Sequence, residues 1–373
     1  MEPFKNLFSP ILVRAMAAHL ARHLPGFDPQ AFAAPILAAL EPLELKARAQ
    51  MIADHLHVAL PGDAARRADV LRGLLHPDRL DHANQPADER GLCGWAILPL
   101  TMVVGQHGIG DFDRSMGLLR EMTMRFSSEF AIRHFLLADQ ARALSIMQGW
   151  LDDPNRHVRR LISEGARPRL PWAMQLPALM DDPTPVLPFL KRLRDDPEPY
   201  VRRSVANHLN DISKDHPALV VRLAADWMAG ADKERRALLS HACRSLIKKG
   251  DAEALAVFGR APPLIAAAVP VLSGRELAMG SRLEMTLPLK SLSAAPQDLT
   301  VDYVLHFLKA NGQRAPKVFK GTVLTLDPGQ ERTLRLTHHF REVTTRRHNP
   351  GEQALSFRIN GVDTVAVTFL LTN

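Results

Sequence analysis

The stretch that decides the fold is DDPNRHVRRLISEGAR, residues 152–167, because it returns as DDPEPYVRRSVANHLN at residues 195–210. The shared pattern DDPxxxVRR recurs after 43 residues, within the roughly 40 to 47 residues of a two-helix HEAT or armadillo unit. Each such unit exposes an apolar face that only a neighbouring unit covers. The repeat therefore predicts a curved, right-handed stack of helices, in which each Asp-Asp-Pro ends one helix and starts the next, with its proline near the first helical position.

The sequence on both sides of this repeat also predicts helices. Apolar residues recur at spacings of three and four between breaks at Pro, Gly and Asp-Pro. Helices are expected at residues 9–23, 43–59, 111–125, 128–137 and 233–248, and the stretch 95–104, apolar all round, predicts a buried helix. We therefore assign residues 1–272 to one helical repeat domain, of which residues 1–90 form an N-terminal helical part.

The pattern changes after Gly274, where apolar residues begin to alternate with polar or small ones. Asn360-Gly361 predicts a type I′ hairpin, which needs positive φ at both central residues. Residues 276–373 are expected to form an antiparallel β-sandwich of immunoglobulin type. The fold class is thus mainly α, a HEAT-like α-solenoid followed by this sandwich.

Composition narrows the environment of the chain. No apolar stretch approaches the roughly 18 residues that span a bilayer, and the opening MEPFKNLFSP lacks the order of regions in a signal peptide. We expect no membrane contact and a cytoplasmic monomer. Cys93 and Cys243 form no CxxC, and the 16 histidines show no metalloprotease spacing, so no disulfide, metal or other cofactor is expected.

Positive charge is concentrated in the repeats. The net charge is +7, and five arginines but a single acid lie between residues 156 and 169. Such a stripe is typical of a surface that contacts phosphates, although a solvated helix face would carry the same charges.

Carboxylates interrupt this cationic stripe. Adding the 43-residue period to Glu164 gives Asn207, and Asp211 lies one helical turn beyond it on the same face. Glu164 precedes Gly165, the expected residue after the helix end, where a negative charge opposes the helix dipole. It is either a functional acid or the partner of Arg160 one turn back.

Two further side chains are candidates with ordinary alternatives. Glu129 in SSEFAIRHF is either functional or a first-turn acid paired with Arg133, in a helix capped by Ser127 or Ser128. Trp172 follows a proline-punctuated loop, where an exposed indole could stack on a base, although tryptophan is usually partly buried.

Five segments together resemble the AlkC branch of the AlkC/AlkD alkylbase DNA glycosylases. They are MEPFKNLF, SSEFAIRHF, HVRRLISEGARPRLPW, VRRSVANHLNDISKDHP and HACRSLIKKG. The resemblance spans almost all of the helical part, and the sandwich resembles the immunoglobulin-like extension of some AlkC members. It implies a glycosylase on HEAT-like repeats that releases cationic bases, such as 3-methyladenine and 3-methylcytosine, from duplex DNA without enclosing a flipped base.

The resemblance also implies roles for single residues. Glu129, Glu164 and Asp211 correspond to active-site carboxylates, and Trp172 to the aromatic side chain beside the lesion. It implies contacts to the DNA backbone for Arg160, Arg167 and Arg203. To these we add Arg159 and Arg202 from the cationic stripe, and Arg346 and Arg347 from the β domain.

The leading hypothesis is a monofunctional DNA glycosylase of base excision repair whose β domain closes around the DNA. Carboxylates near the sugar would stabilise an oxocarbenium-like transition state and orient water. A HEAT-repeat scaffold for protein partners and a non-catalytic DNA-damage binder remain as alternatives. Base release from methylated duplex and the salt dependence of DNA binding distinguish the three.

Overall fold

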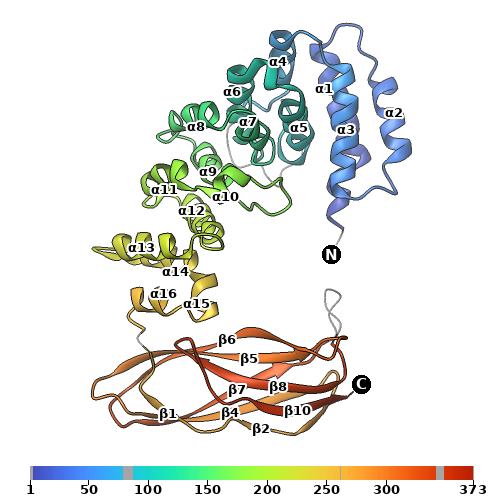
Figure 1. The fold of residues 1–373 in the computed structure, drawn as a ribbon. Coiled ribbons are helices and arrows are strands. Elements are labelled where there is room, and N and C mark those ends of the chain that lie inside the picture. The colour runs from blue at the N-terminus through green and yellow to red at the C-terminus, as the bar shows by residue number, and fades with distance from the viewer. Residues whose placement is uncertain (1–2, 79–86, 261, 342–347, 373) are drawn as a thin grey trace. The chain divides into compact units, whose positions relative to one another are not determined.

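The structure is a computed structural model that describes residues 3–78, 87–260, 262–341 and 348–372 (Figure 1). These residues form two compact units. The first runs to Asp215 and also includes Lys233–Ala242, and the second contains His216–Asp232 and the chain from Cys243 onward. The units are defined by packing, and where the functional domains divide stays a prediction.

The first unit is helical, with most helices where the sequence predicts them. α1 (Pro10–His23) begins after Ser9, whose hydroxyl accepts the amide N–H of Leu12 at 3.3 Å, as an N-cap does. The other helices before the repeat are α2 (Pro29–Ala39), α3 (Leu45–Ala59), α4 (Ala64–Gly73), α5 (Ile97–His107), α6 (Phe112–Thr123), α7 (Ile132–Ala138) and α8 (Gln140–Gln148). Short 3₁₀ turns are η1 (Phe4–Leu7), η2 (Gly94–Ala96), η3 (Ile109–Asp111) and η4 (Thr184–Val186). The apolar stretch around α5 is buried, as predicted.

The two copies of the repeat motif form equivalent structures. They lead into α9 (Arg156–Gly165) and α12 (Pro199–Ile212), which pack against each other. Asp153 and Asp196 each accept the amide N–H two residues further on, at 2.8 and 2.9 Å, so the motif forms a turn in front of the helix. Its proline, Pro154 or Pro197, lies two residues before the first helical residue, near the start of the helix as predicted.

The remaining helices of this unit complete the stack. They are α10 (Pro177–Asp181), α11 (Leu187–Leu193) and α14 (Lys233–Ala242). α11 packs on α9 and α14 on α12, which is the nearest-neighbour packing expected of repeats. The single helix predicted at residues 233–248 is broken at Cys243, because α15 (Arg244–Lys249) starts anew after it.

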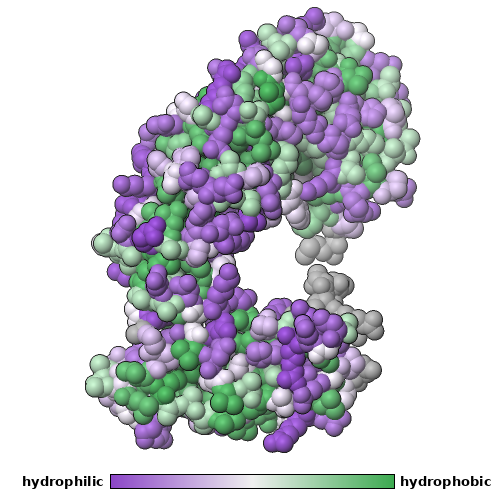
Figure 2. Space-filling view, in the orientation of Figure 1, coloured by the Kyte–Doolittle hydropathy of each residue, from purple (hydrophilic) through white to green (hydrophobic). Residues whose placement is uncertain are grey.

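Hydrophilic residues predominate on the face of the helical unit drawn in Figure 2, with smaller hydrophobic patches between them. The apolar faces are buried between helices. Val158, Leu161 and Ile162 of α9 and Val201 and Val205 of α12 are all inaccessible to solvent. This packing holds the two helices in a fixed register, on which the geometry of the polar side chains between them depends.

The second unit begins with helices and continues as two β-sheets. α13 (Pro217–Met228) packs on α16 (Ala252–Val257), which follows α15. One sheet has β4 (Arg282–Ser291) paired with β1 (Ile265–Ala267), β2 (Val271–Leu272) and β7 (Glu331–His339). The other has the order β3-β10-β8-β5-β6, with β9 paired to β8. Its strands are β3 (Glu276–Ala278), β5 (Gln297–Leu308), β6 (Arg314–Leu326), β8 (Gly351–Ile359), β9 (Val362–Asp363) and β10 (Val367–Thr372).

The predicted alternation in the strands is confirmed. Leu283, Met285, Leu287 and Leu289 of β4 all point into the core shared by the two sheets. Asn360 and Gly361 have φ values of 43° and 86°, so the β8–β9 hairpin has the positive φ pair that a type I′ turn requires. Two details differ from prediction: β3 pairs with β10 in parallel, and β1 and β2 lie before Gly274, where no strand was predicted.

The structure bears on three expectations from composition, which concern membrane helices, metal sites and cysteines. None of the helices in the described residues is long and apolar enough to cross a membrane. In the same part of the chain, no group of three or more His, Cys, Asp or Glu side chains is arranged to hold a metal ion. Cys93 and Cys243 are both free thiols and buried.

Candidate active site

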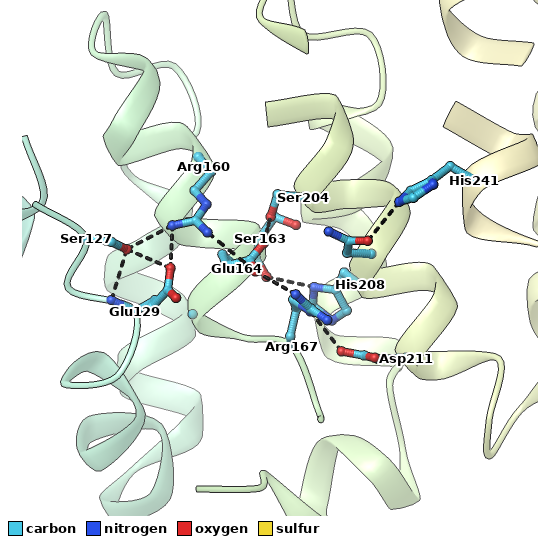
Figure 3. Close-up of polar contacts among 12 residues, drawn as sticks. Ser127, Glu129, Arg160, Ser163, Glu164, Arg167, Ser204, His208, Asp211 and His241 are labelled. Atoms are coloured by element: carbon cyan, nitrogen blue, oxygen red, sulfur yellow. Dashed lines mark hydrogen bonds and ion pairs between the residues drawn. The ribbon is translucent and has the colours of Figure 1, made fainter. Parts of the chain in front are cut away.

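Arg167 connects two of the predicted carboxylates (Figure 3). Its Nη1 donates to Glu164 Oε1 at 2.6 Å, and its Nε donates to Asp211 Oδ2 at 2.8 Å. Glu164 lies in the last turn of α9, Arg167 two residues after that helix, and Asp211 in the last turn of α12. The packing of α9 on α12 therefore brings Glu164 and Asp211 to one guanidinium.

Arg160 connects Glu164 to the third carboxylate. Its Nη1 pairs with Glu129 Oε2 and donates to Ser127 Oγ at 2.9 Å, and its Nη2 lies 3.4 Å from Glu164 Oε1. The guanidinium also lies over the ring of Tyr200, 5.1 Å from its centroid. Arg160 thus contacts a carboxylate on each side, and its guanidinium lies over an aromatic ring.

The five charged groups alternate in sign in the order Glu129, Arg160, Glu164, Arg167, Asp211, and we call them the acid–arginine chain. Three carboxylates against two guanidinium groups leave it one negative charge. Lys214, whose side chain is 45% exposed, donates to Asp211 Oδ1 at 2.9 Å and offsets that charge. A buried ion pair is tolerated only when its remaining hydrogen bonds are satisfied, and here both ends receive further donors.

Glu164 is held in its ionised form. Burial opposes ionisation, but Arg160, Arg167 and the hydroxyl of Ser204, which donates to Oε2 at 2.6 Å, outweigh it and lower the pKa of Glu164. Burial likewise works against the charge on Arg160 and Arg167, yet the neighbouring carboxylates raise the pKa of both. The ion pairs of Glu164 with Arg160 and Arg167 therefore favour the charged form of all three side chains.

This geometry is compatible with both interpretations of Glu164, as the ion-pair partner of Arg160 and as a functional acid. The ion pair with Arg160 exists, and Glu164 also converges with Asp211 on Arg167. The two carboxylates are 5% and 2% exposed, but arginine, serine and lysine donors satisfy their oxygens. They face each other across the interface between the repeats.

Glu129 lies in a turn before α7, outside the helix in which it was expected. Ser127 Oγ donates to its Oε2 at 2.8 Å, and Ala131, which cannot cap through its side chain, occupies the N-cap of α7. The pairing of Glu129 with Arg133 and the serine cap of this helix are therefore wrong. Glu129 belongs to the acid–arginine chain instead.

Trp172 is exposed, as one of its two interpretations required. Its residue surface is 72% accessible, and its φ of 67° lies in the left-handed region that bulky residues rarely adopt. Lys46 Nζ donates to the Trp172 carbonyl at 2.6 Å and lies 6.0 Å from the ring centroid. Strained backbone of this kind is typical of functional sites, where the surroundings fix it.

A cavity of about 900 Å³ is lined by Trp172 and by two of the three carboxylates, those of Glu129 and Glu164. Apolar side chains supply much of the remaining wall, namely Leu45, Trp95, Leu98, Met102, Phe126, Phe130, Leu170 and Met174. An apolar cavity with a few polar groups on one wall is the usual form of a ligand site.

The arginines of the repeat motif have different surroundings. Arg159 and Arg202, which are equivalent, each donate to two carbonyls of the turn before their helix, Asp153 and Pro154 for the former and Asp196 and Pro197 for the latter. Arg203 is exposed and lines a groove between α12 and α14. Arg346 and Arg347 lie outside the described residues.

Sequence reasoning missed Ser204 and His208. Together with Asp211 they stand at positions i, i+4 and i+7 of α12, on the face turned to α9. His208 Nδ1 donates to the Ser163 carbonyl at 2.9 Å. The spacing of Ser204 and His208 from Asp211 can be recognised in the sequence once Asp211 is taken as a site residue.

Comparisons with known proteins agree along the whole chain. A family model described as "Uncharacterised protein YhaZ, C-terminal Ig-like domain" matches residues 267–373. The uncharacterized protein YhaZ of Bacillus subtilis (strain 168) is 35% identical over 363 residues, which cover 97% of each chain. The solved structure of the Pseudomonas fluorescens alkylpurine DNA glycosylase AlkC, bound to DNA containing an abasic site analog, is 34% identical with a TM-score of 0.87 and complete coverage of both chains.

Proposed function

The chain belongs to the AlkC branch of the AlkC/AlkD DNA alkylation repair glycosylases, and from this premise we propose that it is an alkylpurine DNA glycosylase of base excision repair. Its partner is duplex DNA, and its reaction is hydrolysis of the bond between an alkylated base and deoxyribose. We extend the proposal to 3-methyladenine and 3-methylcytosine as substrates, which carry a positive charge.

A cationic base is already a good leaving group, so the reaction needs little general-acid catalysis. As the bond to the base lengthens, positive charge develops on the sugar, as in other glycosidic cleavages. Fixed negative groups near that charge stabilise the transition state without reorganising. A carboxylate can also orient or deprotonate the attacking water.

The acid–arginine chain is the observation that carries this proposal. Its three carboxylates come from separate segments and meet on the guanidinium groups of Arg160 and Arg167, and two of them, Glu129 and Glu164, line the cavity. Because Arg160 and Arg167 bind these carboxylates, we assign to both the alignment of Glu164, in place of the phosphate contacts predicted from the resemblance. Glu164 and Asp211 are the acids closest to the sugar in this proposal.

Trp172 supplies the contact with the damaged base. The residue is 72% exposed, so it can meet a base that stays in the duplex, and we propose that no nucleotide is fully enclosed. Arg203 and, in the second unit, Arg346 and Arg347 add phosphate contacts. The protein acts as a monomer in the cytoplasm, at the nucleoid when DNA is bound.

Methylated duplex tests the proposal directly. Wild-type protein should release methylated bases, identified by chromatography, whereas Glu164→Gln and Asp211→Asn should lose ~10² to 10³-fold in single-turnover rate. Both variants keep the size of the side chain and should bind undamaged duplex as wild type does.

Two outcomes would contradict this assignment. Binding of methylated DNA by the wild type without any base release would identify a damage binder instead of an enzyme. Loss of DNA binding in both variants, with a normal rate at saturating protein, would show that these carboxylates do not act in the chemical step.

A further inference from the structure

Arg133 is fully buried and uses its whole guanidinium on backbone carbonyls. Nε donates to Met174 O at 2.7 Å, and Nη1 donates to Gly165 O at 2.8 Å and to Arg167 O at 2.7 Å. Nη2 lies 3.5 Å from Pro168 O. A planar fork with five N–H donors is the side chain that can bridge several carbonyls at once.

These acceptors lie at both ends of one segment, residues 165–174, which runs from the end of α9 to the residue two positions after Trp172. Arg167 of the acid–arginine chain lies inside it. The segment contains little regular structure, and its own closing hydrogen bond runs from the Leu176 amide to Pro168 O at 3.1 Å. Arg133 therefore tethers the start and the end of this loop to α7.

The tether depends on a close approach of α7 to α9. Gly165 is the last residue of α9, and a Cβ there would lie 2.6 Å from Ile132 Cγ2, so a larger residue would push the helices apart. Gly165 was expected just beyond the helix as a C-terminal residue; its actual role is to admit Ile132 and its neighbour Arg133.

The charge on Arg133 survives its burial. Desolvation, reinforced by the nearby Arg167, lowers the pKa of Arg133 to about 10, which still leaves it protonated at neutral pH. The hydrogen bonds of this buried charge go to carbonyls, while the nearby carboxylates of Asp211, Glu129 and Glu164 favour it electrostatically. What the arginine provides is a fixed geometry for the segment.

We propose that Arg133 is a positioning residue for base release, which sets where Trp172 and Arg167 stand relative to Glu164. The left-handed backbone at Trp172 fits this role, because a strained residue keeps its conformation only when both flanks are fixed. One flank is held by Arg133 at Met174, and Trp172 itself is held by Lys46. The inference rests on the proposed glycosylase function.

Arg133→Lys is the decisive variant, because it keeps the charge and removes the fork. We expect the single-turnover rate of base release to fall ~10²-fold, the size expected for a misplacement of about 1 Å. Binding to undamaged duplex should be unchanged. Time-resolved anisotropy of tryptophan emission, with Trp172→Phe as blank, should show a new fast motion at Trp172.

The chain offers a matched control in Arg48. It is also buried and donates to four carbonyls, of Lys5, Phe8, Glu41 and Leu43, close to the N-terminus. Arg133→Lys and Arg48→Lys should lower the melting temperature by similar amounts. Arg48→Lys, however, should change neither the rate of base release nor the motion of Trp172.

If lysine cannot be buried at position 133, Arg133→Gln replaces it with a neutral donor that needs no charge in the interior. Equal rates in the variants of positions 133 and 48, at a temperature where both are folded, would reduce Arg133 to a purely stabilising residue. The anisotropy measurement needs no catalysis, so it would report on the tether even if wild-type protein released no base.

Discussion

The two copies of DDPxxxVRR have nearly the same backbone, yet their second arginines have different surroundings. Arg160 is buried between Glu129 and Glu164, whereas Arg203, 43 residues later, is exposed beside a groove. The first arginines, Arg159 and Arg202, donate to the equivalent carbonyls of their turns in both copies. A repeat thus fixes where a side chain starts, and the residues facing it decide what it does.

The sharpest test of this contrast replaces Arg160 and Arg203 by alanine in turn. Arg160→Ala leaves Glu129 and Glu164 buried without their shared cation, so we expect a loss of about 3 to 5 kcal/mol in the free energy of unfolding. Base release should fall as well, because the carboxylates repel each other out of position. Urea denaturation and single-turnover kinetics measure the two effects.

Arg203→Ala should leave stability unchanged and weaken binding to any duplex. Loss of one phosphate contact should lower the slope of log affinity against log salt by about 1. If instead both variants lost the same stability, or the same salt slope, the distinction between the two arginines would be wrong.

The first arginines of the two copies, Arg159 and Arg202, allow the same comparison with smaller expected effects on stability. Arg159 and Arg202 both brace their turn, but Arg159 also binds the buried carboxylate of Asp196 with Nε and Nη2, at 2.6 and 3.0 Å. We expect Arg159→Ala to cost about 3 kcal/mol and Arg202→Ala about 1 kcal/mol of unfolding free energy. Equal losses would mean that the contact with Asp196 adds nothing to the bracing.

The repeat and the alternating strands were predictable because each follows from local periodicity. The 43-residue spacing placed Glu164 and Asp211 on facing helices, and Asn360-Gly361 marked its hairpin. The partners of the acids were harder to predict, since Glu129 meets Arg160 across 31 positions and Arg133 reaches carbonyls up to 41 positions away. Nothing in the local sequence shows that a buried arginine will bind backbone oxygens, and only the packing of α7 on the loop reveals it.

The contrast between the copies extends to Gly165 and His208, which are also 43 residues apart. Where Gly165 admits Ile132, His208 fills the interface and donates Nδ1–H to Ser163 O. Its Nε2 is buried with no hydrogen-bond partner among the described residues. Protonation there would bury an unmatched charged donor, and burial lowers the pKa of His208 to about 4, despite the nearby Asp211.

This environment predicts a smaller, pH-dependent effect on stability. In the unfolded chain, the His208 pKa returns to its ordinary 6.5, so the unfolded state takes up a proton first as the pH falls below that value. Stability should therefore drop by about 2 kcal/mol between pH 7 and pH 5 through this residue alone. His208→Gln, which keeps a donor for Ser163 O but cannot titrate, should flatten the dependence by that amount in urea denaturation at the two pH values. An identical slope in the variant would mean that His208 is protonated in the folded protein, and the second copy would then carry a charge at the position where the first has only a glycine.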